Sequence, residues 1–132
     1  MNRPPHFEAE VHFLSAEEGG RKTPCISGYR PTIRYSDDGL WSAEQNFIGK
    51  DSINPGEDVT SQMALLEPGY HVGRLVVGTE FTLTEGAKVV ARGIVTKTFP
   101  ALDDATPIPV PEPERQSLAR TILNWLLPGK TR

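Results

Sequence analysis

The sequence predicts an all-β domain built from several short strands, and three observations support that fold class. Residues 7–13 alternate strictly between apolar and polar side chains, a period of two that is typical of a strand with one buried face. The chain contains 12 glycines and 12 prolines, which suits short strands joined by tight turns. Residues 88–99 form the longest β-rich run, and apolar side chains on both faces of its first half indicate a strand covered on both sides.

The first predicted strand ends at a glycine turn. Residues 17–20 read Glu-Glu-Gly-Gly, and paired glycines allow the backbone a tight reversal. Cys25 lies between two turn signals and is expected to fill a small core position. Residues 32–35 alternate again and predict a second strand. Residues 36–39 read Ser-Asp-Asp-Gly, which is typical of a hairpin turn, so residues 40–41 are expected to begin the return strand.

The middle of the chain is less regular. Residues 42–50 hold few large apolar side chains, so this stretch is ambiguous, and a loop is one interpretation of it. The elements expected after it are a turn at 54–57, a strand at 59–65, a loop or short strand at 70–80 and a strand at 81–84. Gly93 in the middle of the last β-rich run predicts a bend or a close backbone approach.

Several segments resemble the C-terminal β-barrel domain of elongation factor Tu, the GTPase that carries aminoacyl-tRNA to the ribosome. They read FEAEVHFLSAEEGGRKTP, GYRPT, INPGEDV and EGAKVVARGIV, and together they cover roughly residues 6 to 99. The resemblance implies an antiparallel Greek-key barrel of about six strands over residues 1–100. We expect this barrel to occur as a stand-alone protein.

The C-terminal part departs from that family. Residues 101–113 are predicted to be a linker, because alternate prolines favour a stiff, extended chain. Residues 114–132 are predicted to hold an amphipathic helix, whose apolar stripe consists of Leu118, Ile122, Trp125 and Leu126. An isolated helix of this length is marginal in water. The stripe is therefore expected to pack on the barrel, on a second copy to form a dimer, or on a partner.

Composition limits the classes of partner and compartment. The net charge is −3, so no overall positive field attracts phosphates. A single cysteine and the lack of a signal-peptide pattern favour a cytoplasmic location. No apolar run approaches the roughly 20 residues of a membrane helix, so no membrane association is expected.

The sequence offers little support for catalysis. It lacks the GxxxxGK[ST] phosphate loop, so the nucleotide chemistry of the parent GTPase is not expected. The three histidines, His6, His12 and His71, lack metal-ligand spacing and are expected to lie on the surface. Cys25 is expected to be a core thiol rather than a nucleophile. We therefore predict no enzyme activity, no catalytic residue, no metal and no cofactor, while an enzyme of unrecognised type remains an alternative.

The resemblance also implies positions for binding RNA or a partner. In elongation factor Tu this barrel contacts the T stem of tRNA, and the matching positions in this chain are Arg21, Lys22, Gly86 and Thr32, the last replacing a glutamine. Glu67 stands where the family has a lysine, and a carboxylate repels phosphate. The most favoured function is therefore a non-catalytic module that binds a protein partner in a translation-related setting. The alternatives are a module that binds the T stem of tRNA, and an immunity or decoy protein that imitates elongation factor Tu.

Overall fold

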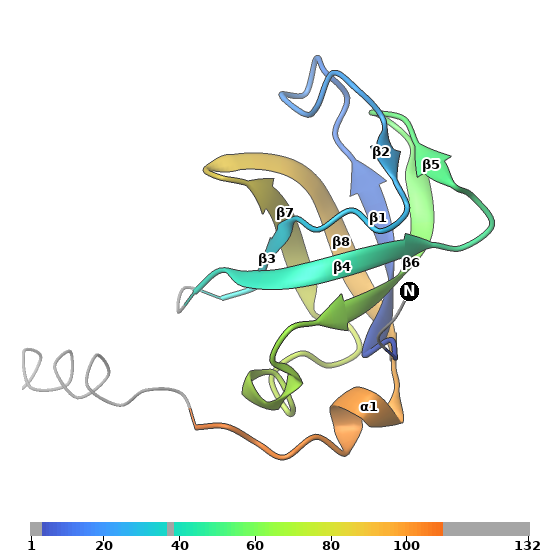
Figure 1. Ribbon diagram of the computed structural model, residues 1–132. Coiled ribbons are helices and arrows are strands. Elements are labelled where there is room, and N and C mark those ends of the chain that lie inside the picture. The colour runs from blue at the N-terminus through green and yellow to red at the C-terminus, as the bar shows by residue number, and fades with distance from the viewer. Residues whose placement is uncertain (1–3, 37–38, 110–132) are drawn as a thin grey trace, which may run out of the picture.

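The computed structural model describes residues 4–36 and 39–109, and its centre is a closed antiparallel β-barrel (Figure 1). The barrel strands follow one another around the barrel in the order β1-β6-β4-β3-β7-β8. Their bounds are β1 Phe7–Phe13, β3 Thr32–Arg34, β4 Trp41–Phe47, β6 Asp58–Leu65, β7 Glu80–Glu85 and β8 Lys88–Thr98. The predicted all-β barrel is thereby confirmed.

Three smaller elements complete the described fold. A two-stranded sheet pairs β2 (Cys25–Ile26) with β5 (Ser52–Ile53), and it places Cys25 in the core with 3% of its surface exposed. A short 3-10 helix, η1 (Pro68–Tyr70), opens the connection between β6 and β7. Most of residues 70–80 form a loop, which is one of the two structures predicted for this stretch. A single turn of α-helix, α1 (Pro100–Asp103), follows β8.

The barrel interior follows from the alternation of β1. Phe7, Ala9, Val11 and Phe13 are all buried, while Glu8, Glu10 and His12 are more exposed. Phe7 meets Phe81 of β7 edge to face, with ring centroids 5.9 Å apart, and aromatic pairs favour this geometry because the positive edge of one ring meets the negative face of the other. The first strand thus supplies one wall of a core to which every barrel strand contributes.

The loop interpretation of the ambiguous residues 42–50 is wrong for most of that stretch. Residues 41–47 form β4, which pairs with both β3 and β6. Its inward side chains are Ala43, Gln45 and Phe47, so the alternation of a strand is present, but a small and a polar residue occupy two of the three buried positions. The Gln45 amide oxygen accepts a hydrogen bond from the Ser61 hydroxyl at 3.0 Å, which offsets part of the cost of burying it.

β8 bends around the barrel, as its length and its internal glycine predict. The register shifts by one residue against β7 at Val90, so the side chains of Val90 and Ala91 are both buried. A second shift, against β1, lies at Thr96. A Cβ atom at Gly93 would lie 2.4 Å from the Cζ atom of Phe81. The close approach predicted at Gly93 is therefore confirmed, and it lets the aromatic ring pack directly against the β8 backbone.

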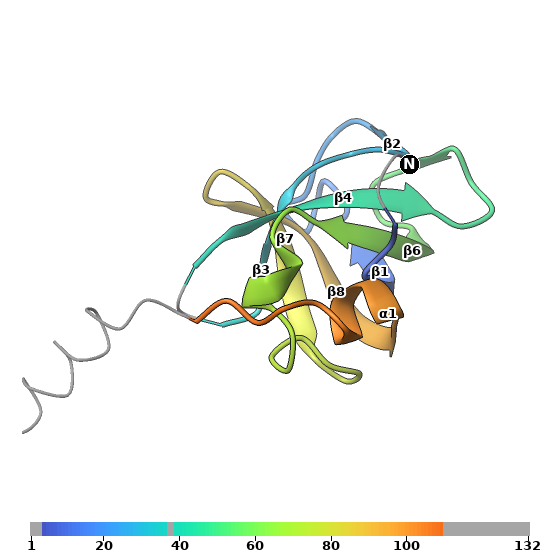
Figure 2. The same cartoon turned by 60° about the horizontal axis from the view of Figure 1, so that its bottom comes forward.

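Residues 100–108, most of which the proline content assigned to a linker, are attached to the rest of the fold at two points. Leu102 of α1 is 1% exposed and belongs to the core. Ile108 donates its backbone N–H to the carbonyl of Gly69 in η1 at 2.9 Å. Figure 2 shows this segment crossing the end of the barrel from α1 towards η1. The predicted helix with its stripe at Leu118–Leu126 lies outside the described residues.

Candidate functional site

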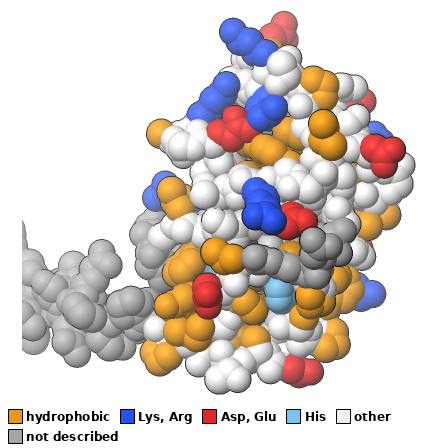
Figure 3. Space-filling model, viewed as in Figure 1, with side chains coloured by type: hydrophobic (Ala, Val, Ile, Leu, Met, Phe, Trp, Pro, Cys, Tyr) orange, Lys and Arg blue, Asp and Glu red, His pale blue; other side chains and the backbone are white. Residues whose placement is uncertain are grey.

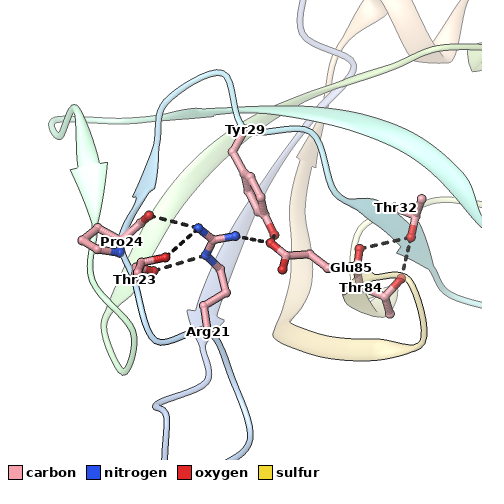
Figure 4. Close-up of polar contacts among 7 residues, drawn as sticks. All are labelled: Arg21, Thr23, Pro24, Tyr29, Thr32, Thr84 and Glu85. Carbon is pink, nitrogen blue, oxygen red and sulfur yellow. Dashed lines mark hydrogen bonds and ion pairs between the residues drawn. The ribbon is translucent and has the colours of Figure 1, made fainter.

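Three segments that are distant in sequence meet at one end of the barrel (Figure 4). They are the loop between β1 and β2, the approach to β3, and the hairpin that joins β7 to β8. The first carries Arg21, the second carries Tyr29 and Thr32, and the third carries Glu85 and Gly86. The fold therefore brings together the segments that carry all four positions singled out for binding RNA or a partner, since Lys22 follows Arg21 in the first loop.

Arg21 is held by a set of acceptors within the protein. Its guanidinium forms an ion pair with Glu85, and it also donates to the carbonyl oxygens of Thr23 at 3.2 Å and Pro24 at 3.3 Å. The guanidinium lies over the ring of Tyr29, with its carbon 5.3 Å from the ring centroid. The side chain is only 24% exposed. The main role of Arg21 is thus to join the loop between β1 and β2 to the β7–β8 hairpin.

Glu85 is the centre of this cluster. Its carboxylate accepts hydrogen bonds from the guanidinium of Arg21 and from the hydroxyl of Tyr29. Partial burial raises the pKa of the Glu85 carboxyl, but the hydrogen bonds from Tyr29 and Arg21 outweigh burial and hold the pKa below its usual value. Burial, followed by the hydrogen bond to Glu85, raises the pKa of the Tyr29 hydroxyl, which therefore stays protonated as a donor.

The other positions that the sequence singled out are Thr32, Gly86, Lys22 and Glu67, and each has a different environment. The Thr32 hydroxyl donates to the backbone carbonyl of Thr84 at 3.2 Å, and it also contacts the Thr84 hydroxyl. Gly86 turns the hairpin with a φ of +61°, a conformation that glycine adopts without strain. Lys22 is exposed beside Arg21. Glu67 belongs to another part of the fold, at the start of η1, where its side chain is exposed.

Replacing Glu85 with Gln is expected to lower the free energy of unfolding by about 1 kcal/mol at neutral pH, because the pair is charged but partly exposed. The pKa of Glu85 is lower in the folded than in the unfolded chain. Its stabilising effect is therefore complete above the unfolded value near 4.5 and disappears as the pH falls through the folded value. Urea unfolding of both proteins between pH 3 and pH 8 measures the difference.

The matched control for that substitution is Glu17→Gln, an exposed carboxylate in the same loop region as Arg21. It is expected to change the free energy of unfolding by less than about 0.5 kcal/mol throughout. A Glu85→Gln protein as stable as the wild type at pH 7, or a difference that persists unchanged at pH 3, would contradict the role given to this ion pair.

A second surface feature is an open groove of about 860 Å³ on the outer faces of β1, β8 and β7 and the end of β3. The strand registers place its side chains in two neighbouring rows. One row is His12, Arg92, Thr82 and Arg34, and the other is Glu10, Ile94 and Glu80. A basic row thus runs beside an acidic row, and Ile94, which is 39% exposed, lies between the two glutamates. No pattern along the sequence pointed to this groove, because its residues are adjacent only across strands.

At one edge of the groove, His12 joins two acidic residues. Its Nδ1 atom lies 2.7 Å from Oδ1 of Asp58, and its Nε2 atom lies 3.2 Å from Oε1 of Glu18. The hydrogen bond to Asp58, and to a smaller degree the contacts with Glu18, raise the pKa of His12. His12 therefore joins β6 to the turn after β1 at the edge of the groove.

The expectation that all three histidines lie on the surface is wrong for two of them. His6 and His71 are 5% and 1% exposed. The ring of His6 accepts the backbone N–H of Leu65 at 2.8 Å, and the ring of His71 contacts the Tyr35 hydroxyl at 2.6 Å. Both rings serve packing and hydrogen bonding at the end of the barrel that η1 and α1 cover. Within the described part of the chain, no three His, Cys, Asp or Glu side chains group closely enough to hold a metal ion.

Comparison with known families gives one finding. The family model described as the elongation factor Tu C-terminal domain matches residues 2–99, which takes in all of the barrel strands. The match ends at Phe99, so α1 and the segment after it lie beyond the matched region. Among residues 4–36 and 39–109, no helix has the length and the hydropathy needed to cross a membrane.

Proposed function

Because the chain belongs to the elongation factor Tu C-terminal domain family, we propose that it is a non-catalytic module that binds a protein partner in a translation-related setting. The observation that carries this proposal is the groove on β1, β8 and β7, where a row of positive side chains adjoins a row of negative ones. A surface with both signs of charge in register suits a protein segment, because proteins can present acidic and basic side chains side by side.

The polar cluster around Arg21 and Glu85 favours a protein partner over a nucleic acid partner. Arg21 is engaged with Glu85, and Thr32 is engaged with Thr84, so two of the positions inherited from the family already have partners within the chain. Figure 3 shows basic and acidic side chains intermixed at the upper end of the molecule rather than a continuous basic surface. Phosphate backbones attract surfaces where positive charge accumulates, so mixed charge weakens RNA binding.

The partner expected in the groove carries acidic side chains opposite Arg92 and a basic side chain opposite Glu10 or Glu80, around an apolar residue over Ile94. Replacing Arg92 with Glu is therefore expected to abolish capture of the partner by the tagged chain, because a carboxylate in the middle of the basic row would repel the acidic side chains of the partner. Mass spectrometry of the proteins that copurify from cells of the source organism measures this. The outward side chain of Arg92 carries no core packing, so the fold is expected to persist.

The matched control is Lys50→Glu, which makes the same charge change at an exposed residue between β4 and β5, outside the groove. Proteins that copurify with the wild type and with Lys50→Glu, but not with Arg92→Glu, are the expected result. If no protein depends on Arg92, the groove is not the binding surface and the proposal fails.

A second candidate function, binding the T stem of tRNA, is favoured by the gathering of Arg21, Thr32 and Gly86 at one end of the barrel. Binding through phosphates weakens as salt rises. A tRNA affinity that falls with salt and is lost in an Arg21→Ala protein would favour this function over the first. Absence of tRNA binding at low salt would remove it.

A further inference from the structure

The end of the described chain is firmly attached to the barrel. Phe99 donates its backbone N–H to the carbonyl of His6 at 3.1 Å, and Thr98 donates its hydroxyl to a carboxylate oxygen of Asp103 at 3.2 Å. Ile108 lies over Gly69, where an added Cβ would come within 2.8 Å of the Ile108 Cγ1 atom. The position from which residues 110–132 continue is therefore set by the fold, beside η1.

Exposed apolar side chains surround this position. We call them, together with one carboxylate, the exit patch, which consists of Leu40, Leu66, Glu67, Tyr70 and Ile108. Leu40 and Leu66 are 52% and 54% exposed. Tyr70 packs on Trp41, with ring centroids 5.1 Å apart, and Ile108 is half-buried. Figure 3 shows hydrophobic side chains gathered at the lower left of the molecule.

The strand register explains why the two leucines share a face. Ala43 of β4 pairs with Leu65 of β6, and one step further along the ladder Leu66 donates its N–H to the carbonyl of Ser42 at 3.4 Å. Leu66 is thus opposite Ser42, and Leu40 lies two residues from Ser42 on the same outward face. Single exposed leucines are ordinary, but a contiguous group usually marks an interface.

We propose that the exit patch is the docking site of residues 114–127 of the same chain. Two features favour this occupant over a second copy or another protein. The chain leaves the barrel within the patch, at Ile108 and Pro109, so only residues 110–113 separate it from the segment. An extended chain of four residues spans about 12 Å, which reaches across a patch of this kind. The stripe predicted at Leu118, Ile122, Trp125 and Leu126 supplies apolar side chains at helical spacing.

Charge complementarity is the second feature. Glu67 is an exposed carboxylate within an otherwise apolar surface. Arg115 precedes Leu118 by three residues and Ile122 by seven, so in a helix it lies on the same face as the stripe. An arginine at this point can pair with Glu67 while the apolar stripe covers the two leucines. This proposal concerns a different face from the groove, so it does not depend on the proposed function.

A charge exchange in the full-length chain tests the docking. The variants are Glu67→Arg, Arg115→Glu and the double exchange, and hydrogen–deuterium exchange of peptides covering residues 114–127 is the measurement. Each single variant is expected to exchange about two- to fivefold faster in this segment, the range for a partly exposed ion pair. The double exchange is expected to restore the wild-type rate. Glu67 makes no capping hydrogen bond to η1, so its replacement leaves that element intact.

Apolar variants give a second, independent readout. Leu66→Asp is expected to speed exchange in residues 114–127 at least about fivefold, because it removes apolar contact and adds a charge. The matched control is Ile26→Asp at the β2–β5 sheet, also exposed, at 70%, which is expected to leave exchange in the segment unchanged. Unprotected residues 114–127 in the wild type, or single charge variants without effect, would overturn the proposal. Protection that falls on dilution, with a dimer in ultracentrifugation, would also overturn it in favour of a second copy.

Discussion

Replacing Leu102 with Ala is expected to lower the free energy of unfolding by about 2–5 kcal/mol, the range for truncating a buried leucine. Leu102 is 1% exposed and belongs to the same core cluster as the barrel strands. It lies beyond residue 99, where the family match ends. The result would therefore show that α1 is part of the cooperative fold rather than an appendage. Urea denaturation followed by circular dichroism measures the change.

Val77→Ala is the control for this effect, because Val77 is 61% exposed in the loop before β7 and its truncation leaves no cavity. Its free energy of unfolding is expected to stay within about 0.5 kcal/mol of the wild type. If Leu102→Ala were equally mild, α1 would be only loosely attached, and the end of the barrel would have to be closed by other side chains.

Replacing Gly20 with Ala is expected to destabilise the fold by about 3 kcal/mol, because the new methyl group meets backbone atoms. A Cβ atom at Gly20 would lie 2.2 Å from the carbonyl oxygen of Leu14. That residue cannot readily move away, since its own N–H donates to the carbonyl of Val90 at 3.0 Å. Thermal and urea unfolding of the variant measure the loss, and failure to accumulate as a folded protein would be its extreme form.

The neighbouring Gly19 provides a comparison in the same turn. Its φ is +94°, and an added Cβ would meet nothing within 4 Å. Gly19→Ala is therefore expected to cost only about 1–2 kcal/mol, from backbone strain alone. Glycine is thus needed at the two positions for different reasons: Gly19 adopts a positive φ, and Gly20 has no room for a Cβ atom. Equal losses at both positions would contradict this distinction.

The binary pattern predicted those strands that bury large apolar side chains. β1 and β6 were recognised because their inward positions hold residues such as Phe7, Val59 and Met63. β4 was recognised only at its start, because its inward positions include Ala43 and Gln45, which carry little hydrophobic signal. The partner that makes a buried glutamine tolerable, Ser61, comes from β6. A strand stabilised by its neighbours in this way is difficult to recognise from its own residues.

The residues of the candidate sites could likewise be predicted only in part from the sequence. The resemblance pointed to Arg21, Thr32 and Gly86, but it did not reveal that Glu85 binds the arginine, because the two residues are 64 positions apart. The groove was not predicted at all, since each of its two rows takes one residue from each of three or four strands. Likewise, the buried positions of His6 and His71 depend on contacts with Leu65 and Tyr35.

The sequence by itself determined the all-β class, the glycine turn after β1 and the close approach at Gly93, because periodicity and backbone restrictions act between near neighbours. It also determined the family, through the segments that resemble it. Only the tertiary structure decided that residues 42–47 continue β4 as a strand, that α1 closes the barrel and that Arg21 is paired within the chain. These features depend on strand pairing and burial between residues far apart in the chain. Which side chains become neighbours through such pairing is a property of the whole barrel and not of any single segment.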